Sequence, residues 1–272
     1  MKKFPAALAA LFVLPCLLAG CGRTSKTATA SPIELTVFAA ASMTETMTTL
    51  GDRYTAEHPD ITIVFNFDSS GTLKTQIQEG AVCDIFISAG QKQMDQLDAS
   101  VNTEGIDLIL DGSRLDILEN KVALAVPDGN PANLYSYEDL IFQLKSGDVM
   151  LAMGNSDVPV GQYTQKLLRH FELDEDALSA AGSLTYASNV KEVTTQIREG
   201  MVDCGVIYQT DAFSAGLTVV DTASAEMCGQ VIYPAAIINT SSHPEAAQAF
   251  LDFLISDAGD EVFSSVGFSP IA

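Results

Sequence analysis

The hydrophobic and polar positions follow two periods along the chain from Ile33 onward. Short runs rich in branched and aromatic residues predict three strands, at 33–40, 61–67 and 84–89. Apolar positions at helical spacing predict three helices between and after them, at about 43–57, 72–79 and 92–97. Strands that alternate with helices form parallel-rich sheets flanked by helices, so the expected fold class is α/β.

A second group of elements lies between two further predicted strands, 121–127 and 230–238. It contains strands at 149–154 and 205–209 and helices at about 161–171 and 190–199. This arrangement predicts a second lobe inserted into the first, with the bracketing strands as a hinge of two crossing strands. The expected first lobe comprises 33–120 plus 233–272, including helices at 244–255 and 258–266, and the second comprises 121–232.

A short internal repeat supports two related lobes. TQIQEGAV at 75–82 and TQIREGMV at 195–202 agree at six of eight positions, and each ends a predicted helix before a strand. The offset of 120 residues places Ser70 opposite Val190. Coincidence in a common helix-glycine-strand ending is the alternative explanation.

The residues before this pattern have a different composition. Two lysines precede an apolar run, 4–18, that is short for a membrane span, so residues 1–20 are predicted to be a signal peptide. The run ends in LAGC, the pattern of bacterial lipoprotein signals, and cleavage would leave Cys21 as a lipid-bearing N-terminus. Residues 21–32 read as a flexible tether. We expect an extracytoplasmic, lipid-anchored protein; ordinary secretion is the alternative.

The charge balance is strongly acidic. The sequence has 14 basic and 35 acidic residues and a formal net charge of −21, and without the signal and tether the net charge is about −25. Such a surface disfavours nucleic acid as a partner.

The cysteines of the main body predict neither a metal site nor a disulfide framework. Cys83, Cys204 and Cys228 are odd in number and lack CxxC spacing. Three buried thiols are expected, with a disulfide between Cys204 and Cys228 as the alternative.

Four predicted strand-to-helix turns carry the candidate chemistry, at 39–45, 67–73, 157–163 and 187–192. Ligands collect at such turns in open α/β sheets. Helix starts present unpaired N–H groups and a partial positive charge, which suit an anion. Gly71 and Gly161 permit close backbone approach, Ser42 and Glu45 have capping-box spacing, and Asn189 is a natural N-cap. The alternative is that all four turns are ordinary helix caps.

At these turns the chain resembles the molybdate-binding proteins of ABC importers. The motifs are FAAASMTE, FDSSGTLKTQIQEGAVCDIFISAGQKQMDQL, VPVGQYTQKLL, SNVKEV and CGVIYQTDA, in the family's order, over about 35–268. The resemblance implies a two-lobed, monomeric type II solute-binding protein. Such a protein closes on molybdate or tungstate and delivers it to a membrane permease served by an ATPase.

The resemblance also implies the residues that hold the tetrahedral anion. These are the hydroxyls of Ser42 and Ser70, the backbone amides of Val160 and Val190, and the hydroxyl of Tyr208. Val160 stands where the family has alanine, which leaves the N–H contact intact but adds bulk. No cofactor and no directly coordinated metal cation are implied, since molybdenum enters as an oxyanion.

Other functions were weighed against this one. Sulfate or phosphate binding, or a lipid-anchored sensor, are the alternatives within binding proteins. A serine hydrolase is disfavoured because neither Ser42 nor Ser70 lies in a GxSxG elbow, and His58, His170 and His243 are expected at the surface. We therefore do not expect an enzyme.

Overall fold

The structure is a computed structural model that describes residues 32–272. The predicted signal peptide, Cys21 and all of the tether except Pro32 lie outside the described residues. Within the described part of the chain, no helix is both long and apolar enough to cross a membrane.

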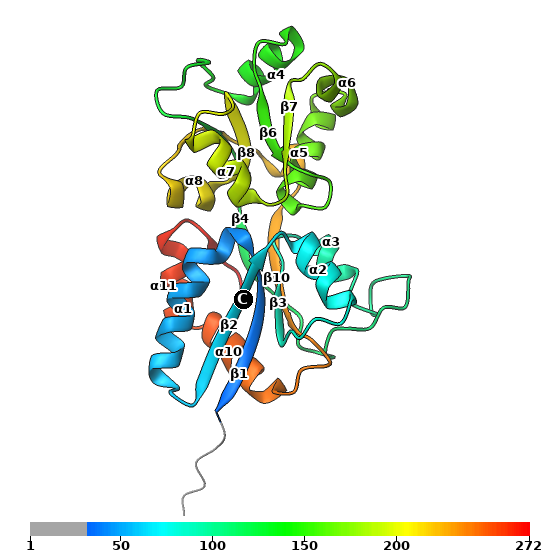
Figure 1. Ribbon diagram of the computed structural model, residues 1–272, viewed down its shortest axis with the longest axis vertical. Coiled ribbons are helices and arrows are strands. Elements are labelled where there is room, and N and C mark those ends of the chain that lie inside the picture. The colour runs from blue at the N-terminus through cyan, green and yellow to red at the C-terminus, as the bar shows by residue number, and fades with distance from the viewer. Residues whose placement is uncertain (1–31) are drawn as a thin grey trace, which may run out of the picture. The chain divides into compact units, whose positions relative to one another are not determined.

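The first lobe contains a six-stranded sheet in the order β11-β4-β10-β3-β1-β2 (Figure 1). β1 lies between β2 and β3 and is parallel to both, whereas β10 is antiparallel to β3 and β4. Four of the six strands therefore point the same way, which confirms a parallel-rich sheet. The strands are β1 (Ile33–Ala40), β2 (Ile61–Asp68), β3 (Ile85–Ile87), β4 (Leu115–Asn120), β10 (Val231–Ile237) and β11 (Ser269–Pro270).

The second lobe contains a five-stranded sheet in the order β7-β6-β8-β5-β9. β6 is parallel to β7 and β8, and β5 is antiparallel to β8 and β9. The strands are β5 (Val122–Val126), β6 (Leu151–Gly154), β7 (Leu184–Ala187), β8 (Cys204–Tyr208) and β9 (Thr218–Thr222).

The chain passes between the sheets twice. On the way out, β4 ends at Asn120 and β5 begins at Val122, so one residue separates the two sheets. On the way back, the chain leaves β9 and enters β10 at Val231. Val231 and Ile232, which the sequence analysis assigned to the second lobe, pair with Asn120 and Glu119 in the first sheet. The two passages lie side by side because β4 and β10 are neighbouring strands (Figure 1).

Helices cover both sheets. In the first lobe α1 packs with α10 and α11, and α2 packs with α3. In the second lobe α5 packs with α9, and α7 packs with α8. The first-lobe helices are α1 (Thr44–Glu57), which follows a short 3-10 turn η1 (Ala41–Met43), α2 (Ser70–Gln78), α3 (Gln91–Asp95), α10 (Pro244–Leu254) and α11 (Asp257–Ser265). Those of the second lobe are α4 (Tyr137–Ser146), α5 (Pro159–His170), α6 (Glu175–Ala180), α7 (Val190–Arg198), α8 (Gln209–Ala215) and α9 (Ala225–Cys228).

Alternation along β1 explains why both faces of the first sheet are buried. Leu35, Val37 and Ala39 face the larger hydrophobic cluster, whereas Phe38 faces a smaller one with Leu73 of α2. Successive side chains of a strand point to opposite faces, so each position packs under a different helix layer. The sheet thereby fixes where β1 ends, and with it the position of η1.

The internal repeat corresponds to a pair of matching helices. α2 and α7 are each nine residues long and begin 120 positions apart, at Ser70 and Val190. Both end with the same backbone geometry, at Glu79 and Glu199. Sequence similarity at the helix ends therefore predicted equivalent positions at the helix starts.

The three cysteines in the described residues, Cys83, Cys204 and Cys228, are free and buried. The alternative of a disulfide between Cys204 and Cys228 is wrong, and the expectation of buried thiols is confirmed. Each side chain packs in an apolar environment.

Candidate functional site

The five residues predicted from the sequence line one small cavity between the lobes. Ser42 and Ser70 come from the first lobe, and Val160, Val190 and Tyr208 come from the second. Its volume is about 10 Å³, room for about one water-sized sphere, so the lobes are nearly closed upon it. The other lining residues are Ala40, Ala41, Asp68, Ser69, Ala89, Val158 and Pro159. All four predicted strand-to-helix turns thus meet at one place.

The lining of this cavity carries no positive side chain. Among the described residues that line it there is no arginine, lysine or histidine. Asp68, the one ionisable carboxyl in the lining, was not among the residues predicted from the sequence. Its Oδ1 accepts hydrogen bonds from the Ser69 N–H (2.7 Å) and from Asn189 Nδ2 (3.4 Å). Hydrogen-bond donors in the cavity are therefore hydroxyls and backbone amides.

The two serines that begin α2 have different roles. Ser69 is the N-cap: its Oγ accepts the Thr72 N–H at 3.1 Å. Ser70 is the first helical residue and is fully buried, and its Oγ accepts the Ala89 N–H at 2.9 Å. A hydroxyl that accepts a hydrogen bond keeps its own proton available for another partner. The Ser70 proton is therefore available to the cavity, where Ser70 is a lining residue.

Ser42 is not a helix cap, so the predicted capping box with Glu45 is wrong. Ser42 lies in η1, and Met43, which precedes α1, has no side-chain cap. The Ser42 Oγ instead lies 2.9 Å from the Tyr233 hydroxyl on β10. Strand β1 is followed by a 3-10 turn, which directs this serine toward the cavity lining rather than along the helix axis.

The two valines contribute their positions at helix starts. Val190 is the first residue of α7, which Asn189 caps by accepting the Glu192 N–H at 3.1 Å, as predicted. Val160 follows Pro159, the first residue of α5. The first N–H groups of a helix have no partner within it, and the helix dipole adds about half a positive charge at that end. Both valine side chains are buried, so neither presents a charge to the cavity.

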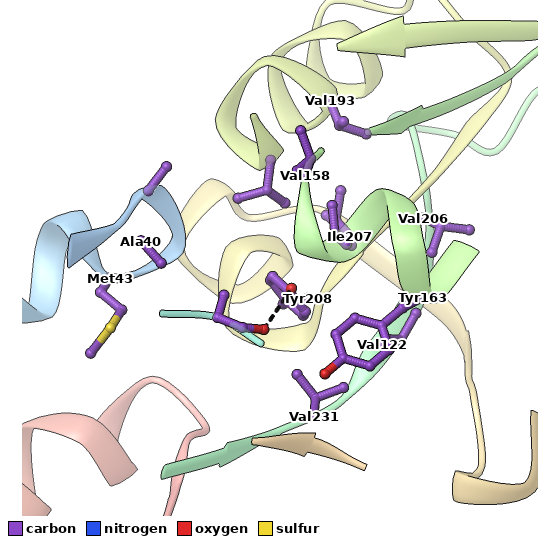
Figure 2. Close-up of a cluster of buried hydrophobic side chains, with 14 of the residues drawn as sticks. Ala40, Met43, Val122, Val158, Tyr163, Val193, Val206, Ile207, Tyr208 and Val231 are labelled. Carbon is purple, nitrogen blue, oxygen red and sulfur yellow. Dashed lines mark hydrogen bonds between the residues drawn. The ribbon is translucent and has the colours of Figure 1, made fainter. Parts of the chain in front are cut away.

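Tyr208 ends β8 and directly precedes α8. Its ring is buried, beside Val122, its partner residue on β5, and edge-on to the Tyr163 ring (Figure 2). The hydroxyl donates to the Ala89 carbonyl across the two lobes at 3.3 Å, a long hydrogen bond. Burial raises the pKa of Tyr208 well above its usual range, so the hydroxyl remains a donor at neutral pH.

Backbone contacts hold the lobes closely together around the cavity. A Cβ added to Gly71 of α2 would lie 2.1 Å from the Asp157 carbonyl oxygen in the other lobe. Gly71 permits a close backbone approach, as predicted, and the backbone that approaches it is that of the second lobe. Gly161 has the predicted close approach within its own lobe, since an added Cβ would lie 2.2 Å from the Asn155 carbonyl oxygen.

An ionic cluster lies beside the cavity and joins the lobes. Lys191 Nζ lies 2.8 Å from Glu45 Oε2 in the first lobe and 3.2 Å from Asp211 Oδ1 in its own lobe. Asp211 is buried, and its carboxylate oxygens make no hydrogen bond within residues 32–272. Burial raises the pKa of Asp211 to about 6, and the nearby Lys191 opposes that rise. The Lys191 ammonium group is paired with the carboxylates of Glu45 and Asp211 and does not line the cavity.

Comparison with known proteins gives consistent matches over nearly the whole described chain. Residues 35–269 match the model of a family described as bacterial extracellular solute-binding proteins. The Bacillus subtilis protein YvgL, provisionally named an ABC transporter substrate-binding lipoprotein, is 31% identical over 271 residues, covering 98% of each chain. The molybdate-binding protein ModA of Haemophilus influenzae is 30% identical over 88% of this chain and 91% of its own.

A solved structure supports the fold. The periplasmic molybdate-binding protein of Azotobacter vinelandii superposes with a TM-score of 0.74 at 20% identity, covering 88% of this chain and 100% of its own. At that identity the similarity establishes the two-lobed architecture alone.

Proposed function

The chain belongs to the family of bacterial extracellular solute-binding proteins, and from this we propose that it binds molybdate, and tungstate, in the cavity between its lobes and delivers the ion to an ABC importer. The observation that carries the proposal is the convergence of Ser42, Ser70, Val160, Val190 and Tyr208 on one cavity. These residues were expected from motifs that lie far apart in the sequence, and they supply donors without positive side chains.

The donors suit a doubly charged tetrahedral anion. An unpaired buried charge is costly, so each oxygen needs hydrogen bonds. Hydrogen bonds to a charged group contribute about 1.5 to 3 kcal/mol each, and two hydroxyls, two amides and the Tyr208 hydroxyl can converge from opposite sides. Redirecting the Tyr208 proton from the Ala89 carbonyl to a ligand costs little because that hydrogen bond is already long.

The same donor set accounts for the expected selectivity. The five proposed ligand groups each have a proton to donate, so they favour ions that are fully ionised at neutral pH over hydrogen phosphate; Asp68, the one carboxylate in the lining, already accepts from Ser69 and Asn189. Sulfate is also fully ionised, and only its smaller size distinguishes it. Sulfate binding is therefore the second candidate function, because the donor chemistry alone suits both ions.

Calorimetry with molybdate, tungstate, sulfate and phosphate tests the proposal. We expect molybdate and tungstate to bind most tightly and phosphate most weakly. If sulfate bound more tightly than molybdate, sulfate binding would be the function. If no oxyanion bound, the proposed site would be rejected.

Ser70 and Ser69 provide a matched pair of variants. Ser70→Ala removes a free proton donor and is expected to weaken molybdate binding by about 1 to 3 kcal/mol; it also lowers stability, because the buried Ala89 N–H loses its acceptor. Ser69→Ala removes the helix cap and is expected to cost about 1 kcal/mol of stability with a smaller effect on affinity. Equal effects of the two variants on affinity would show that the assigned roles are wrong.

We also propose that a lipid on Cys21 anchors the protein outside the cytoplasm beside its permease. The support is the LAGC pattern of the sequence. Cys21→Ser is expected to release the protein from the membrane fraction, and mass spectrometry of the N-terminal peptide should show the lipid. An unmodified Cys21 in the membrane-bound protein would contradict the proposal.

A further inference from the structure

A chain of buried polar side chains connects the cavity to the strands that pass between the lobes. Ser42 Oγ lies 2.9 Å from the Tyr233 hydroxyl, and Asn120 Nδ2 lies 3.2 Å from the same hydroxyl. Asn120 ends β4 and Tyr233 lies on the adjacent β10. All three are at most 5% exposed, so within this group each hydrogen bond is shielded from bulk water.

The direction of these hydrogen bonds follows from the donor inventory. The Lys121 N–H donates to Asn120 Oδ1 at 2.8 Å, which fixes the orientation of the amide. The Asn120 NH₂ group has two protons and donates them to Thr210 Oγ1, at 2.9 Å, and to the Tyr233 oxygen. The Tyr233 oxygen is therefore an acceptor from Asn120, and its own proton needs an acceptor elsewhere.

Ser42 is that acceptor. Within residues 32–272, the Tyr233 hydroxyl has hydrogen-bond contacts only with Asn120 and Ser42. Burial raises the pKa of Tyr233 well above its usual range, so the proton is retained at neutral pH. When Tyr233 donates to Ser42, one acceptor position of the Ser42 oxygen is filled and the Ser42 proton points away from Tyr233, which leaves it available to the cavity that Ser42 lines.

We propose that Tyr233, held by Asn120, is a positioning residue that orients the Ser42 proton toward the ligand and thereby biases the cavity toward fully ionised oxyanions. This inference rests on the proposed function and deepens it. A ligand oxygen that carries a proton needs an acceptor, and the relay from Asn120 through Tyr233 presents it with the Ser42 proton instead. Fully ionised tetrahedral ions are accepted.

Ser70 is fixed in the same way by a different group. Its oxygen accepts the Ala89 backbone N–H at 2.9 Å, a donor that no side-chain substitution removes. The hydrogen bond from Tyr233 to Ser42, in contrast, can be removed by a side-chain substitution. Tyr233→Phe retains the ring, which packs edge-on against Tyr208 and Phe268, and removes only the hydroxyl.

The test compares molybdate and phosphate binding in wild type, Tyr233→Phe, Ser42→Ala and the double variant. We expect Tyr233→Phe to weaken molybdate binding about tenfold while phosphate binding stays level or improves, because Ser42 is then free to accept a proton. In the Ser42→Ala background, Tyr233→Phe should have no further effect on either ion. Tyr137→Phe is the matched control, since the Tyr137 hydroxyl is buried without a hydrogen-bond partner in the described chain.

Asn120→Ala should also release the Ser42 hydroxyl from its fixed orientation. It leaves Tyr233 in place but frees its oxygen to accept from Ser42, so the preference for molybdate over phosphate should narrow in the same direction. An unchanged preference in both variants, or an equal loss with and without Ser42, would overturn the relay. If the wild type bound no oxyanion, the proposed function itself would fail, and the relay with it.

Discussion

Gly71→Ala should prevent tight binding without unfolding the protein. The added Cβ would lie 2.1 Å from the Asp157 carbonyl oxygen, whereas such contacts are essentially never shorter than 3.0 Å. The lobes must therefore separate by about 1 Å at this point. The three atoms nearest to the new methyl group all belong to Asp157 of the second lobe, so the first lobe itself is not strained.

The second lobe cannot easily yield at this position. The Asp157 N–H donates to Asn155 Oδ1 at 2.9 Å, and the Val158 N–H donates to the Asn155 carbonyl at 3.1 Å. Behind this turn, Gly161 of α5 packs directly on the Asn155 carbonyl. The turn is thus braced from both sides, and opening of the lobes is the easier response.

The expected loss follows from the donors that each lobe contributes. An opening of about 1 Å lengthens hydrogen bonds from the Val160 and Val190 amides beyond useful range if the anion stays on the serines. Two lost hydrogen bonds to an anion correspond to about 3 to 6 kcal/mol, or about 100-fold to 10,000-fold in affinity. The stability of the unliganded protein should stay level or rise, because alanine is the better helix former by about 0.5 to 1 kcal/mol.

Calorimetry with molybdate, thermal melting and small-angle scattering with and without the ion measure these effects. Gln78→Ala, at the exposed end of the same helix, is the control for helix propensity. Affinity within about threefold of wild type, or a ligand-induced compaction like that of wild type, would refute the reasoning.

Three further predictions concern buried and ionic groups. The pKa of Asp211 is about 6 in the folded protein, above its value in the unfolded chain. Ionisation of this carboxyl therefore lowers the free energy of unfolding as pH rises from about 4 through 6. Asp211→Asn should therefore raise the melting temperature at pH 8 and show no gain at pH 4 in calorimetric scans; a gain of equal size at both values would contradict this. Glu45→Gln removes the first-lobe partner of Lys191 and should weaken molybdate binding by less than about tenfold, with the difference from wild type shrinking in about 1 M salt; a difference that persists there would argue against the ion pair. Tyr137→Phe should leave the free energy of unfolding unchanged or raise it in urea titrations, because the hydroxyl it removes is buried and unpaired among the described residues, and a clear loss would show a missed partner.

Local patterns predicted much of this fold because each signal lies within a few residues. The strands β1, β2 and β8 and the matching helices α2 and α7 are read from periodicity and from a repeat in the sequence. β4 was missed because Asp116 and Glu119 interrupt a short apolar run, and its stability comes from pairing with β10, more than 100 positions away.

The site was predicted in part, for the same physical reason. The family resemblance located Ser42, Ser70 and Tyr208, and the structure brings them to one cavity. The partner of Ser42 was not predictable, because Tyr233 lies 191 positions away and only the folded sheet brings it near. The spacing of Ser42 and Glu45 wrongly indicated a capping box. This spacing is compatible with a cap, but in the folded protein the Ser42 hydroxyl pairs with the Tyr233 hydroxyl instead.

The paired helices α2 and α7 have a consequence for the empty protein. Their amino ends come from different lobes and border the same small space, so two like partial charges are pressed together whenever the lobes meet with nothing between them. We expect this repulsion to favour separation of the lobes when the cavity is empty, and a bound anion to replace it with attraction. Under the proposed function, closed lobes would therefore distinguish the loaded protein from the empty one.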